Sequence, residues 1–456
     1  MNKNTPKVSV ILPSLNVADY IEECIDSVVH QYLQELEIIC VDAGSTDGTK
    51  EILDRYARED PRITILHSSK KSYGCQINRG LDYASGEYVA VLETDDWIEP
   101  GMYQYLYENG APEELDYVAS DFDLLYQLQN GKDYLIRQRL FHGSRQDWYG
   151  RILDSDEIAT LRASDYVLWK GIYNREFLNS HHIRLHPSPG AAFQDMGFLQ
   201  QVKTYAMGAK YFDKSFYRYR QDRKEASSKG LEGMGYYENE FLWIKDELRL
   251  CQLLNNIHRK YYYFTMSISF ITKYDQILVR LKGDWQDQRL FGPYKWFRQQ
   301  VSEAVNNNLL DESMYGGELW EKLMLLLTSQ KAYSQMVMDR EKKKGDCLQA
   351  LLKRIKNRPV IIFGCGIRGE RLMFYCDSNH IKIHGFCDNN PALAGNEKFG
   401  FPIIAASDLK HEADKKDGVI LLSMKNGRED VCRQLLSMGF EGERIVDKIP
   451  AGILDG

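Results

Sequence analysis

The chain has 456 residues, of which 43% are hydrophobic and 27% are charged, and these proportions are typical of a soluble globular protein. Such a length predicts two or three domains rather than one. The formal net charge of −7 argues against a general nucleic-acid binder. No run of about 18 apolar residues is present, so the sequence predicts no membrane-spanning helix.

The cysteine and tyrosine content indicates the class of protein more closely. The nine cysteines are scattered and no two have CxxC spacing, which favours reduced thiols in a cytoplasm over a disulfide framework or a zinc site. The residues after Met1 run into a predicted strand without a secretory signal, which also fits a cytoplasmic protein. The 29 tyrosines suit a large interface, such as a homo-oligomer contact, or a sugar-contacting surface.

Strands and helices alternate in the first hundred residues. Short apolar runs predict buried strands at residues 8–13, 37–42, 63–66 and 87–92. Apolar residues at helical spacing predict helices at residues 20–31, in the segment that ends at Tyr56, and at 73–84; Ser45 or Thr46 is the expected N-cap of the second. This alternation predicts an α/β fold with a doubly wound sheet.

Carboxylates follow two of these strands. Asp42 ends the second strand, and Glu93, Asp95 and Asp96 follow the fourth, at the edge of an open α/β sheet where ligands bind. Three carboxylates in four residues at the end of a buried strand are costly unless a cation lies among them. A divalent metal ion that holds a ligand's phosphates would satisfy them. The alternatives are an acidic loop that caps the next helix and, for Asp42, a turn before Gly44.

A basic loop lies at the same predicted edge. Lys70 and Lys71 could bring ammonium groups to the acids, so the edge fits a nucleoside diphosphate bound with a metal ion. The carboxylates could also accept hydrogen bonds from ribose hydroxyls. Solvated surface lysines are the alternative.

Four separate motifs make the chain resemble the family 2 glycosyltransferases, which have the GT-A fold. The motifs are residues 8–16, 41–49, 78–89 and 92–97, and the resemblance covers about the first 230 residues. It implies inverting transfer of a sugar from a nucleotide-sugar, most often UDP-linked, with Mg²⁺ or Mn²⁺ as cofactor. The implied acceptor is a glycan or a lipid-linked sugar in bacterial surface-polysaccharide synthesis.

The resemblance also implies roles for single residues. Glu93, Asp95 and Asp96 would bind the metal ion. The residues implied to contact the nucleotide-sugar are Pro13, Asn16, Asp42, Lys71, Asp95 and Arg220. For Arg220, structural pairing is the alternative. The chain departs from the family at Glu93, where the first acid is usually aspartate, and at Ala43 and Leu15, where some members have an acid and an aromatic residue.

The resemblance places the catalytic base at Asp195, where the family usually reads Glu-Asp and this chain has Gln194–Asp195. Inverting transfer needs one base opposite the leaving diphosphate to take the proton of the acceptor. A carboxylate at a helix start faces the positive end of the helix dipole, so helix capping is the alternative. We expect the nearby His181, His182 and His186 to be loop or surface residues.

The segment between these motifs is less informative. Residues 116–120 predict a fifth strand, followed by Asp121 and Asp123, and residues 127–165 read as irregular polar chain. Residues 166–177 resemble the strand-to-helix segment that lines the acceptor side in the family.

The middle of the chain, residues 231–356, reads as helical. One apolar stripe consists of Phe241, Ile244, Leu248, Cys251 and Leu254. Dense aromatic residues at 261–264 and 294–297 suit helix packing, with a stacked acceptor sugar as the alternative. Residues 331–358 hold nine Lys or Arg and three Asp or Glu. A solvated linker is the default there, and peripheral contact with the inner face of an anionic membrane is the alternative.

Residues 357–456 predict a small Rossmann-like domain. A strand leads into Gly364, Gly366 and Gly369, a helix follows, and the next strand ends at Asp388, 19 positions past Gly369 (388 − 369). This is the context that the dinucleotide-binding fingerprint requires. We expect a module that binds a nucleotide or nucleotide-sugar and serves regulation or assembly. A purely structural domain is the alternative.

The sequence therefore predicts three domains, at residues 1–230, 231–356 and 357–456, and a glycosyltransferase as the leading function. A sugar nucleotidyltransferase is one rival, but such an enzyme would normally have a glycine-rich basic loop where this chain has Ser14–Ala18. A sensor that binds nucleotide-sugars through the C-terminal domain is the second rival.

Overall fold

The computed structural model describes residues 5–222, 230–231, 233–247, 249, 252 and 254–449. The chain divides into two compact units. The first is formed by Met1–Leu125 and Ile136–Val337, and the second by Tyr126–Leu135 and Met338–Gly456. The boundary predicted near residue 230 therefore falls inside the first unit, because the helical segment up to Val337 belongs with the first sheet.

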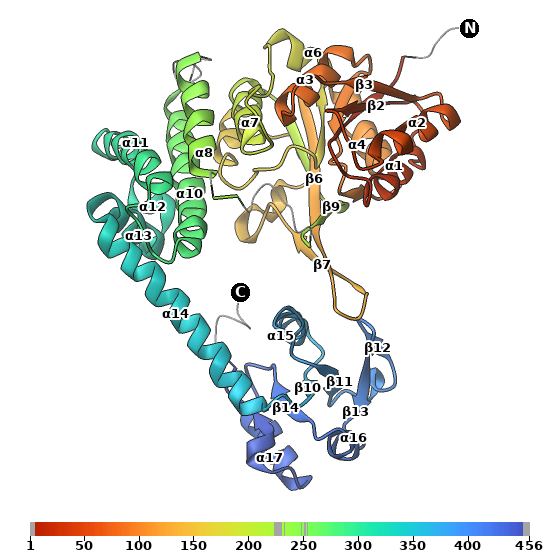
Figure 1. The fold of residues 1–456 in the computed structure, drawn as a ribbon, viewed down its shortest axis with the longest axis vertical. Coiled ribbons are helices and arrows are strands. Elements are labelled where there is room, and N and C mark those ends of the chain that lie inside the picture. The colour runs from red at the N-terminus through yellow and green to blue at the C-terminus, as the bar shows by residue number, and fades with distance from the viewer. Residues whose placement is uncertain are drawn as a thin grey trace. The chain divides into compact units, whose positions relative to one another are not determined.

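A nine-stranded sheet forms the centre of the first unit (Figure 1). The strand order is β3-β2-β1-β4-β8-β6-β9-β5, and β7 pairs with β6. Strands β1 to β4 pair in parallel, whereas β8 is antiparallel to both β4 and β6. The bounds are β1 Val8–Ser14, β2 Leu36–Asp42, β3 Ile63–His67, β4 Tyr88–Val91, β5 Trp97–Ile98, β6 Tyr117–Gln127, β7 Asp133–Gln138, β8 Gly171–Asn174 and β9 Ala209–Arg220. The predicted α/β class is confirmed.

Buried apolar runs build the parallel half of this sheet. Every residue of β1 and β4 is buried. Ser14 pairs in register with Asp42, and Asp42 with His67, so β1, β2 and β3 end at one edge. Helix α3 packs closely on β1, because a Cβ atom on Gly80 would lie 2.6 Å from the Ile11 side chain.

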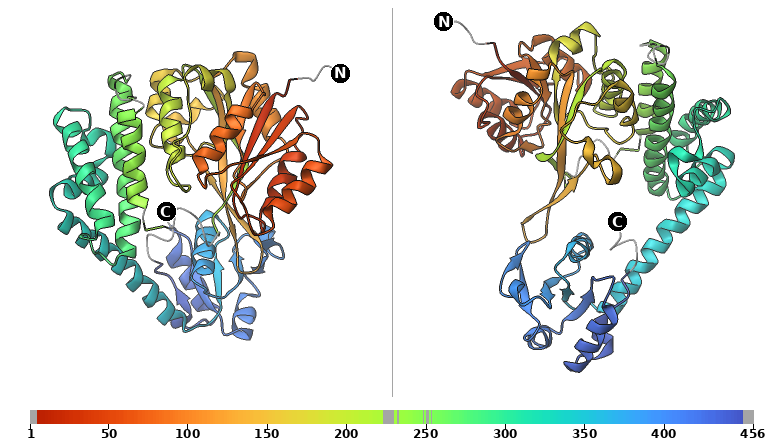
Figure 2. Two further views of the ribbon diagram at one scale, coloured as in Figure 1. Left: turned by 45° about the horizontal axis from the view of Figure 1, so that its top comes forward. Right: turned by 180° about the vertical axis from the view of Figure 1, so that it is seen from behind.

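Helices pack around this sheet, as the two further views in Figure 2 show. Their bounds are α1 Ile21–Val29, α2 Thr49–Glu59, α3 Tyr73–Tyr83, α4 Met102–Glu108, α5 Ser155–Thr160, α6 Arg175–Ser180 and α7 Gln194–Tyr205. The N-cap predicted for α2 is wrong. Gly48 holds that position with a φ of 102°, which glycine adopts without strain, and Ser45 instead donates to Asp42.

The structure also corrects the segment after residue 116. Strand β6 continues to Gln127, so Asp121 and Asp123 lie inside the strand rather than after it. Asp121 accepts a hydrogen bond from the Tyr149 hydroxyl at 2.8 Å, and Asp123 pairs with Arg218 at 2.9 Å. Strand β7 and helix α5 occupy part of the stretch predicted to be irregular.

The helical segment has its own aromatic core within the first unit. The Phe270 and Phe297 rings stack with centroids 3.8 Å apart, and Phe241 and Ile244 are buried as the apolar stripe predicts. Leu248 and Cys251 of that stripe lie outside the described residues. The bounds are α8 Gly233–Leu242, α10 Asn256–Arg280, α11 Gln288–Asn306, α12 Glu312–Tyr315, α13 Gly317–Thr328 and α14 Gln330–Ile355. In the described part of the chain, no helix has the length and apolar character needed to cross a bilayer.

The second unit contains a six-stranded sheet in the order β12-β13-β11-β10-β14-β15, in which only β12 pairs antiparallel. The tip of the β6–β7 hairpin also belongs to this unit, where Tyr126 lies 4.6 Å from Phe374 between ring centroids. The bounds are β10 Val360–Phe363, α15 Ile367–Ser378, β11 Ile383–Asp388, β12 Glu397–Lys398, β13 Phe401–Ala405, α16 Leu409–Lys415, β14 Val419–Leu422, α17 Arg428–Ser437 and β15 Ile445–Val446.

Candidate functional site

The acids that follow β4 do not have equal surroundings. Asp96 is 2% exposed, and its two carboxylate oxygens accept hydrogen bonds from the Tyr217 hydroxyl and the Arg220 backbone N–H, each at 2.8 Å. Burial, and then the charges of Asp95 and Glu93, raise the pKa of Asp96 well above its usual range. Two hydrogen bonds therefore hold Asp96 inside the fold, and its role as a metal ligand stays a prediction.

The remaining acids of the predicted metal site are half-buried. Glu93 Oε1 accepts a hydrogen bond from the Tyr73 hydroxyl at 2.6 Å. Within the described ranges, no group of three or more His, Cys, Asp or Glu side chains is arranged to hold a metal ion. Metal binding by Glu93, Asp95 and Asp96 therefore stays a prediction of the sequence.

Aromatic residues that the sequence analysis did not single out as site residues support this edge. The Tyr217 hydroxyl donates to Asp96 and accepts from the Glu93 backbone N–H at 3.2 Å. Trp169 stacks on Tyr217 with ring centroids 3.9 Å apart. The alternation of tyrosine and arginine in β9 is the one sequence signal for this arrangement.

The residues near β1 and β2 that are predicted to contact the nucleotide form hydrogen bonds within two adjoining loops. Asn16 accepts a hydrogen bond from the Thr46 N–H at 2.9 Å, and its own N–H donates to Ser45 at 3.0 Å. Asp42 is 3% exposed and accepts from the Gly44 N–H at 2.9 Å, which is the turn predicted as its alternative role. Pro13 is buried, and its carbonyl accepts from Thr94 at 2.8 Å.

The two predicted cationic contacts differ in their surroundings. Lys71 is exposed, and its carbonyl accepts from the Gly190 N–H at 3.0 Å. The Arg220 guanidinium donates to the Asp95 carbonyl at 3.1 Å and to the Glu23 carboxylate at 2.6 Å. Arg220 therefore lies at the acidic edge, and it is paired structurally there.

Asp195 lies in the first turn of α7, and its carboxylate accepts a hydrogen bond from the Met196 N–H at 2.8 Å. Burial raises the pKa of Asp195 to about 6, and the hydrogen bond from Met196 acts in the opposite direction. A carboxyl group with this pKa is mostly ionised at pH 7 and is still a better proton acceptor than an exposed aspartate.

A cavity of about 610 Å³ connects Asp195 with the acidic edge. Asp195, Glu93, Tyr73 and Tyr219 all line it, so the candidate base and an acid after β4 face one space. The charges of Glu93 and Asp195 both raise the pKa of Tyr73, after the larger effect of burial, which is consistent with their proximity.

A second buried acid packs behind Asp195. Glu240 of α8 is 1% exposed, and its Oε2 lies 3.0 Å from Nδ1 of His186. A Cβ atom on Gly197 would lie 1.8 Å from Glu240 Oε1, so glycine allows α8 to approach α7 there. His186 lies in the loop before α7, as expected, and its ring is half-buried and stacks on Trp243 with centroids 4.7 Å apart.

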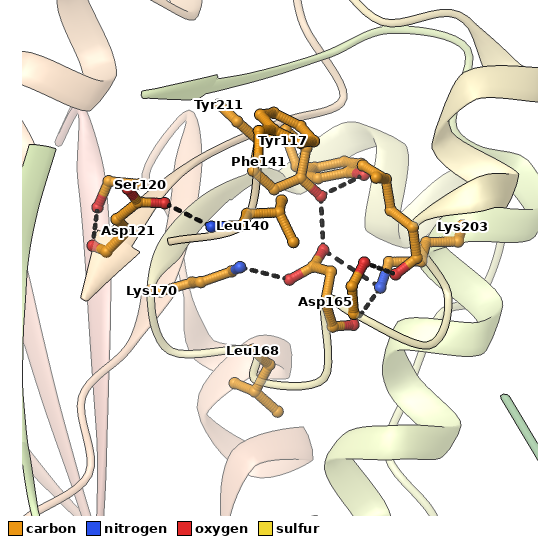
Figure 3. Close-up of polar contacts among 12 residues, drawn as sticks. Tyr117, Ser120, Asp121, Leu140, Phe141, Asp165, Leu168, Lys170, Lys203 and Tyr211 are labelled. Carbon is orange, nitrogen blue, oxygen red and sulfur yellow. Dashed lines mark hydrogen bonds and ion pairs between the residues drawn. The ribbon is translucent and has the colours of Figure 1, made fainter. Parts of the chain in front are cut away.

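Buried charges tie the loop before β8 to α7 (Figure 3). Asp165 is 3% exposed and pairs with Lys170 at 2.6 Å and with Lys203 of α7 at 3.2 Å. The Tyr211 hydroxyl donates to the same carboxylate at 2.5 Å. Burial alone would raise the pKa of Asp165, but the two ammonium groups hold it well below its usual range. This cluster fixes the helix whose first turn carries Asp195.

The glycine-rich loop of the second unit has the predicted location between β10 and α15. A Cβ atom on Gly369 would lie 1.9 Å from the Gly364 carbonyl oxygen, so glycine is required for the helix to start there. Gly366 is the N-cap of α15, and Asp388 accepts hydrogen bonds from the Cys365 N–H at 2.9 Å and the Asn390 N–H at 3.0 Å. Nucleotide binding at this loop stays a prediction.

Comparisons with protein families agree with the geometry of the first unit. Residues 9–160 match the model of glycosyl transferase family 2, and residues 356–446 match a family described as C2185-like, N-terminal. The first of these segments contains β1 to β4, the acids after β4 and Asp42. This part of the chain is therefore similar to family 2 glycosyltransferases.

Curated relatives are glycosyltransferases by name. The chain is 28% identical over 268 residues to the uncharacterized glycosyltransferase YibD of Escherichia coli, which is 57% of this chain and 74% of that protein. It is 28% identical to the glycosyltransferase GlyG of Streptococcus pneumoniae, over 47% of this chain and 70% of that one. It is 25% identical to the cholesterol galactosyltransferase of Borreliella burgdorferi, over 63% and 80%.

A solved structure shares the fold. The S. aureus TarS 1–349 structure in complex with UDP-GlcNAc has a TM-score of 0.52 and 19% identity, and the match covers 74% of this chain and 92% of that one. The family model, the named relatives and this fold together identify the chain as a glycosyltransferase.

Proposed function

We propose that the chain is an inverting, metal-dependent glycosyltransferase that moves a sugar from a UDP-linked donor to a hydroxyl of a glycan or lipid-linked acceptor. The observation that carries the proposal is the shared cavity, in which the half-buried Asp195 faces the same space as Glu93. TarS, which shares the fold, was solved with UDP-GlcNAc, and this supports the choice of donor class. The biological setting we propose is cell-surface polysaccharide synthesis.

The acids at the edge fit a divalent ion, Mg²⁺ or Mn²⁺, that is held partly by the donor. Crowded negative charge is the observation that supports this, because Asp95 and Glu93 both raise the pKa of the buried Asp96. Mg²⁺ in phosphate-transfer sites is commonly bound through one or two carboxylates together with substrate phosphates. Asp95 and Glu93 would hold the ion, which when bound neutralises charge on the leaving diphosphate.

Asp195 would act as the general base. It takes the proton from the acceptor hydroxyl while that oxygen forms a bond to the anomeric carbon of the donor sugar. The bond from this carbon to the diphosphate oxygen breaks with inversion, and the nucleoside diphosphate leaves with the bonding electron pair. The raised pKa of Asp195 suits this role, because general-base efficiency is best when the pKa lies near the working pH.

A panel of nucleotide-sugars assayed with and without Mn²⁺, for hydrolysis and for transfer, tests the proposal. We expect metal-dependent release of a nucleoside diphosphate from at least one donor. Asp195→Asn should reduce transfer by roughly a hundred- to ten-thousandfold, because a positioned base contributes about that factor. Donor binding by calorimetry should remain.

The outcomes separate the rivals. Donor binding without any turnover by the native chain would favour a nucleotide-sugar sensor, and formation of pyrophosphate from a nucleoside triphosphate and a sugar phosphate would favour a nucleotidyltransferase. Transfer at the native rate by Asp195→Asn would remove Asp195 from the role of base. Peripheral membrane contact through residues 331–358 and self-association remain predictions of the sequence.

A further inference from the structure

The cavity at Asp195 extends beyond the donor edge to a helix outside the matched family segment. Side chains of α10 line it at positions 265, 269, 272 and 276, which lie on one face of a helix by their spacing of four, three and four residues. Helix α10 packs against α8 and α5 in the first unit (Figure 1). Thr265 is buried and Thr272 and Gln276 are exposed, so this face leads from the interior to the surface.

The hydroxyl groups on this face already donate hydrogen bonds to backbone carbonyls. Thr265 donates to the Tyr261 carbonyl at 2.8 Å, Ser269 to the Thr265 carbonyl at 2.5 Å, and Thr272 to the Ile268 carbonyl at 2.9 Å. A hydroxyl group has one proton and two acceptor lone pairs, so each of these oxygens keeps acceptor capacity. The cavity wall therefore suits a ligand rich in hydrogen-bond donors rather than an anion.

Such back-bonding is common in helices and would by itself indicate nothing about a ligand. The aromatic lining supplies the second observation. Tyr166 and Tyr236 line the same cavity and remain 52% and 39% exposed, so their rings are accessible to a ligand. Apolar and aromatic walls with a few placed polar groups are typical of small-molecule sites. A sugar ring presents both an apolar face and donating hydroxyls.

Two cations, Arg162 and Lys273, line this cavity together with three carboxylates, so the lining carries no excess of positive charge. Arg162 donates to Thr204 at 3.0 Å and contacts His258 at 2.9 Å, and Lys273 lies over the Phe193 ring at 5.8 Å. Asp195 and Glu93 would repel a second anion in the same space. The electrostatics therefore favour a neutral ligand beside α10.

We propose that this part of the cavity is an acceptor subsite for a neutral pyranose sugar, formed by the α10 hydroxyl face together with Tyr166 and Tyr236. The inference rests on the proposed function, because Asp195 would take the proton from the acceptor held there. The exposed end of the face at Thr272 and Gln276 allows a longer glycan to continue out of the cavity.

Saturation-transfer NMR on the full chain tests the subsite directly. The probes are methyl glycopyranosides, the corresponding disaccharides and, as an anionic comparison, glycerol phosphate. We expect at least one neutral sugar to bind native protein, and we expect the double variant Thr272→Val with Tyr236→Ala to weaken that binding roughly tenfold or more, because two contacts are lost. The KM for the same sugar as acceptor should rise by a similar factor, with nucleotide affinity by calorimetry retained.

Matched controls come from the same unit. Thr328 has the same kind of back-bond, at 2.8 Å to the Met324 carbonyl, and Tyr83 is 47% exposed; neither lines this cavity. The double variant Thr328→Val with Tyr83→Ala should leave binding and transfer unchanged. Its thermal midpoint provides the reference for the folding of the test variant.

Two results would overturn the subsite. The first is binding of none of the neutral sugars, or of glycerol phosphate alone, by a chain that turns over a nucleotide-sugar. The second is equal sugar binding by the native chain and by a folded Thr272→Val, Tyr236→Ala variant. Sugar binding that depends on α10 in a chain without donor turnover would instead support the subsite and contradict the proposed function.

Discussion

The two sheets of this protein each end a parallel strand with an aspartate, and they use it in the same way. Asp42 after β2 accepts from the Gly44 N–H, and Asp388 after β11 accepts from the Cys365 and Asn390 N–H groups. In the first unit, however, a further helix brings Asp195 to a cavity of about 610 Å³ shared with Glu93. The two strand-end aspartates therefore share a turn-forming role, and what distinguishes the first unit is a cavity lined by acids from two elements.

The largest expected effect is a loss in the free energy of unfolding of the first unit, and it tests how firmly α7 is held beside the cavity. Asp165→Asn leaves Lys170 and Lys203 without their shared carboxylate, and breaking a buried ion pair costs roughly 3–5 kcal/mol. Urea unfolding of the first unit, followed by tryptophan fluorescence, measures this loss. Glu22→Gln is the matched control in the same unit, since its exposed pair with Arg55 should contribute about 1 kcal/mol or less. Equal losses would show that the buried cluster does not hold α7.

The next effect separates the two strand-end regions. Asp95→Asn should reduce transfer by roughly a hundred- to a thousandfold while keeping the thermal midpoint, because removal of one electrostatic group at a reacting centre has about this cost. Asp388→Ala should instead lower the thermal midpoint of the second unit, with a loss on the order of 1 kcal/mol for a missing backbone cap. Initial rates and calorimetric unfolding, measured for both variants, distinguish a loss of transfer from a loss of stability. An Asp95→Asn variant that is active and less stable would break the comparison.

Much of the first unit was predictable because its signals are local. Mostly apolar runs predict β1, β2 and β4, and their parallel pairing places Asp42 and the acids after β4 at one edge. The length of β6 was not predictable, because Asp121 and Asp123 are polar and are accommodated only through Tyr149 and Arg218, which are distant in the sequence.

The same reason limits what the sequence says about the site. The sequence predicts Asp96 as a metal ligand beside Asp95, and it does not reveal the Tyr217 hydroxyl, 121 residues further along the chain, or the Arg220 N–H that satisfy it when buried. Glu240 and His186 are 54 residues apart and have no shared local pattern. Buried polar groups satisfied by long-range partners are thus the part of this fold that periodicity and motifs do not reveal.

The smallest effect concerns the pH dependence that Asp195 and Glu240 give to transfer. Asp195, with a pKa of about 6, must be ionised to accept a proton, so kcat/KM should fall as the pH drops below about 6. Burial raises the pKa of Glu240 to about 7, the His186 contact lowers it, and the charge of Asp195 raises it further. Glu240 therefore ionises after Asp195 and in response to its charge.

Glu240→Gln should consequently leave the fall near pH 6 in place and remove a second, smaller inflection near pH 7. Full pH–rate profiles of the native chain and the variant measure both features. The glutamine side chain of the variant must fit into the same close approach between α8 and Gly197 of α7. A shift of the fall near pH 6 by one unit or more in Glu240→Gln would mean that Glu240 is already ionised when Asp195 titrates. The order of ionisation argued here would then be reversed.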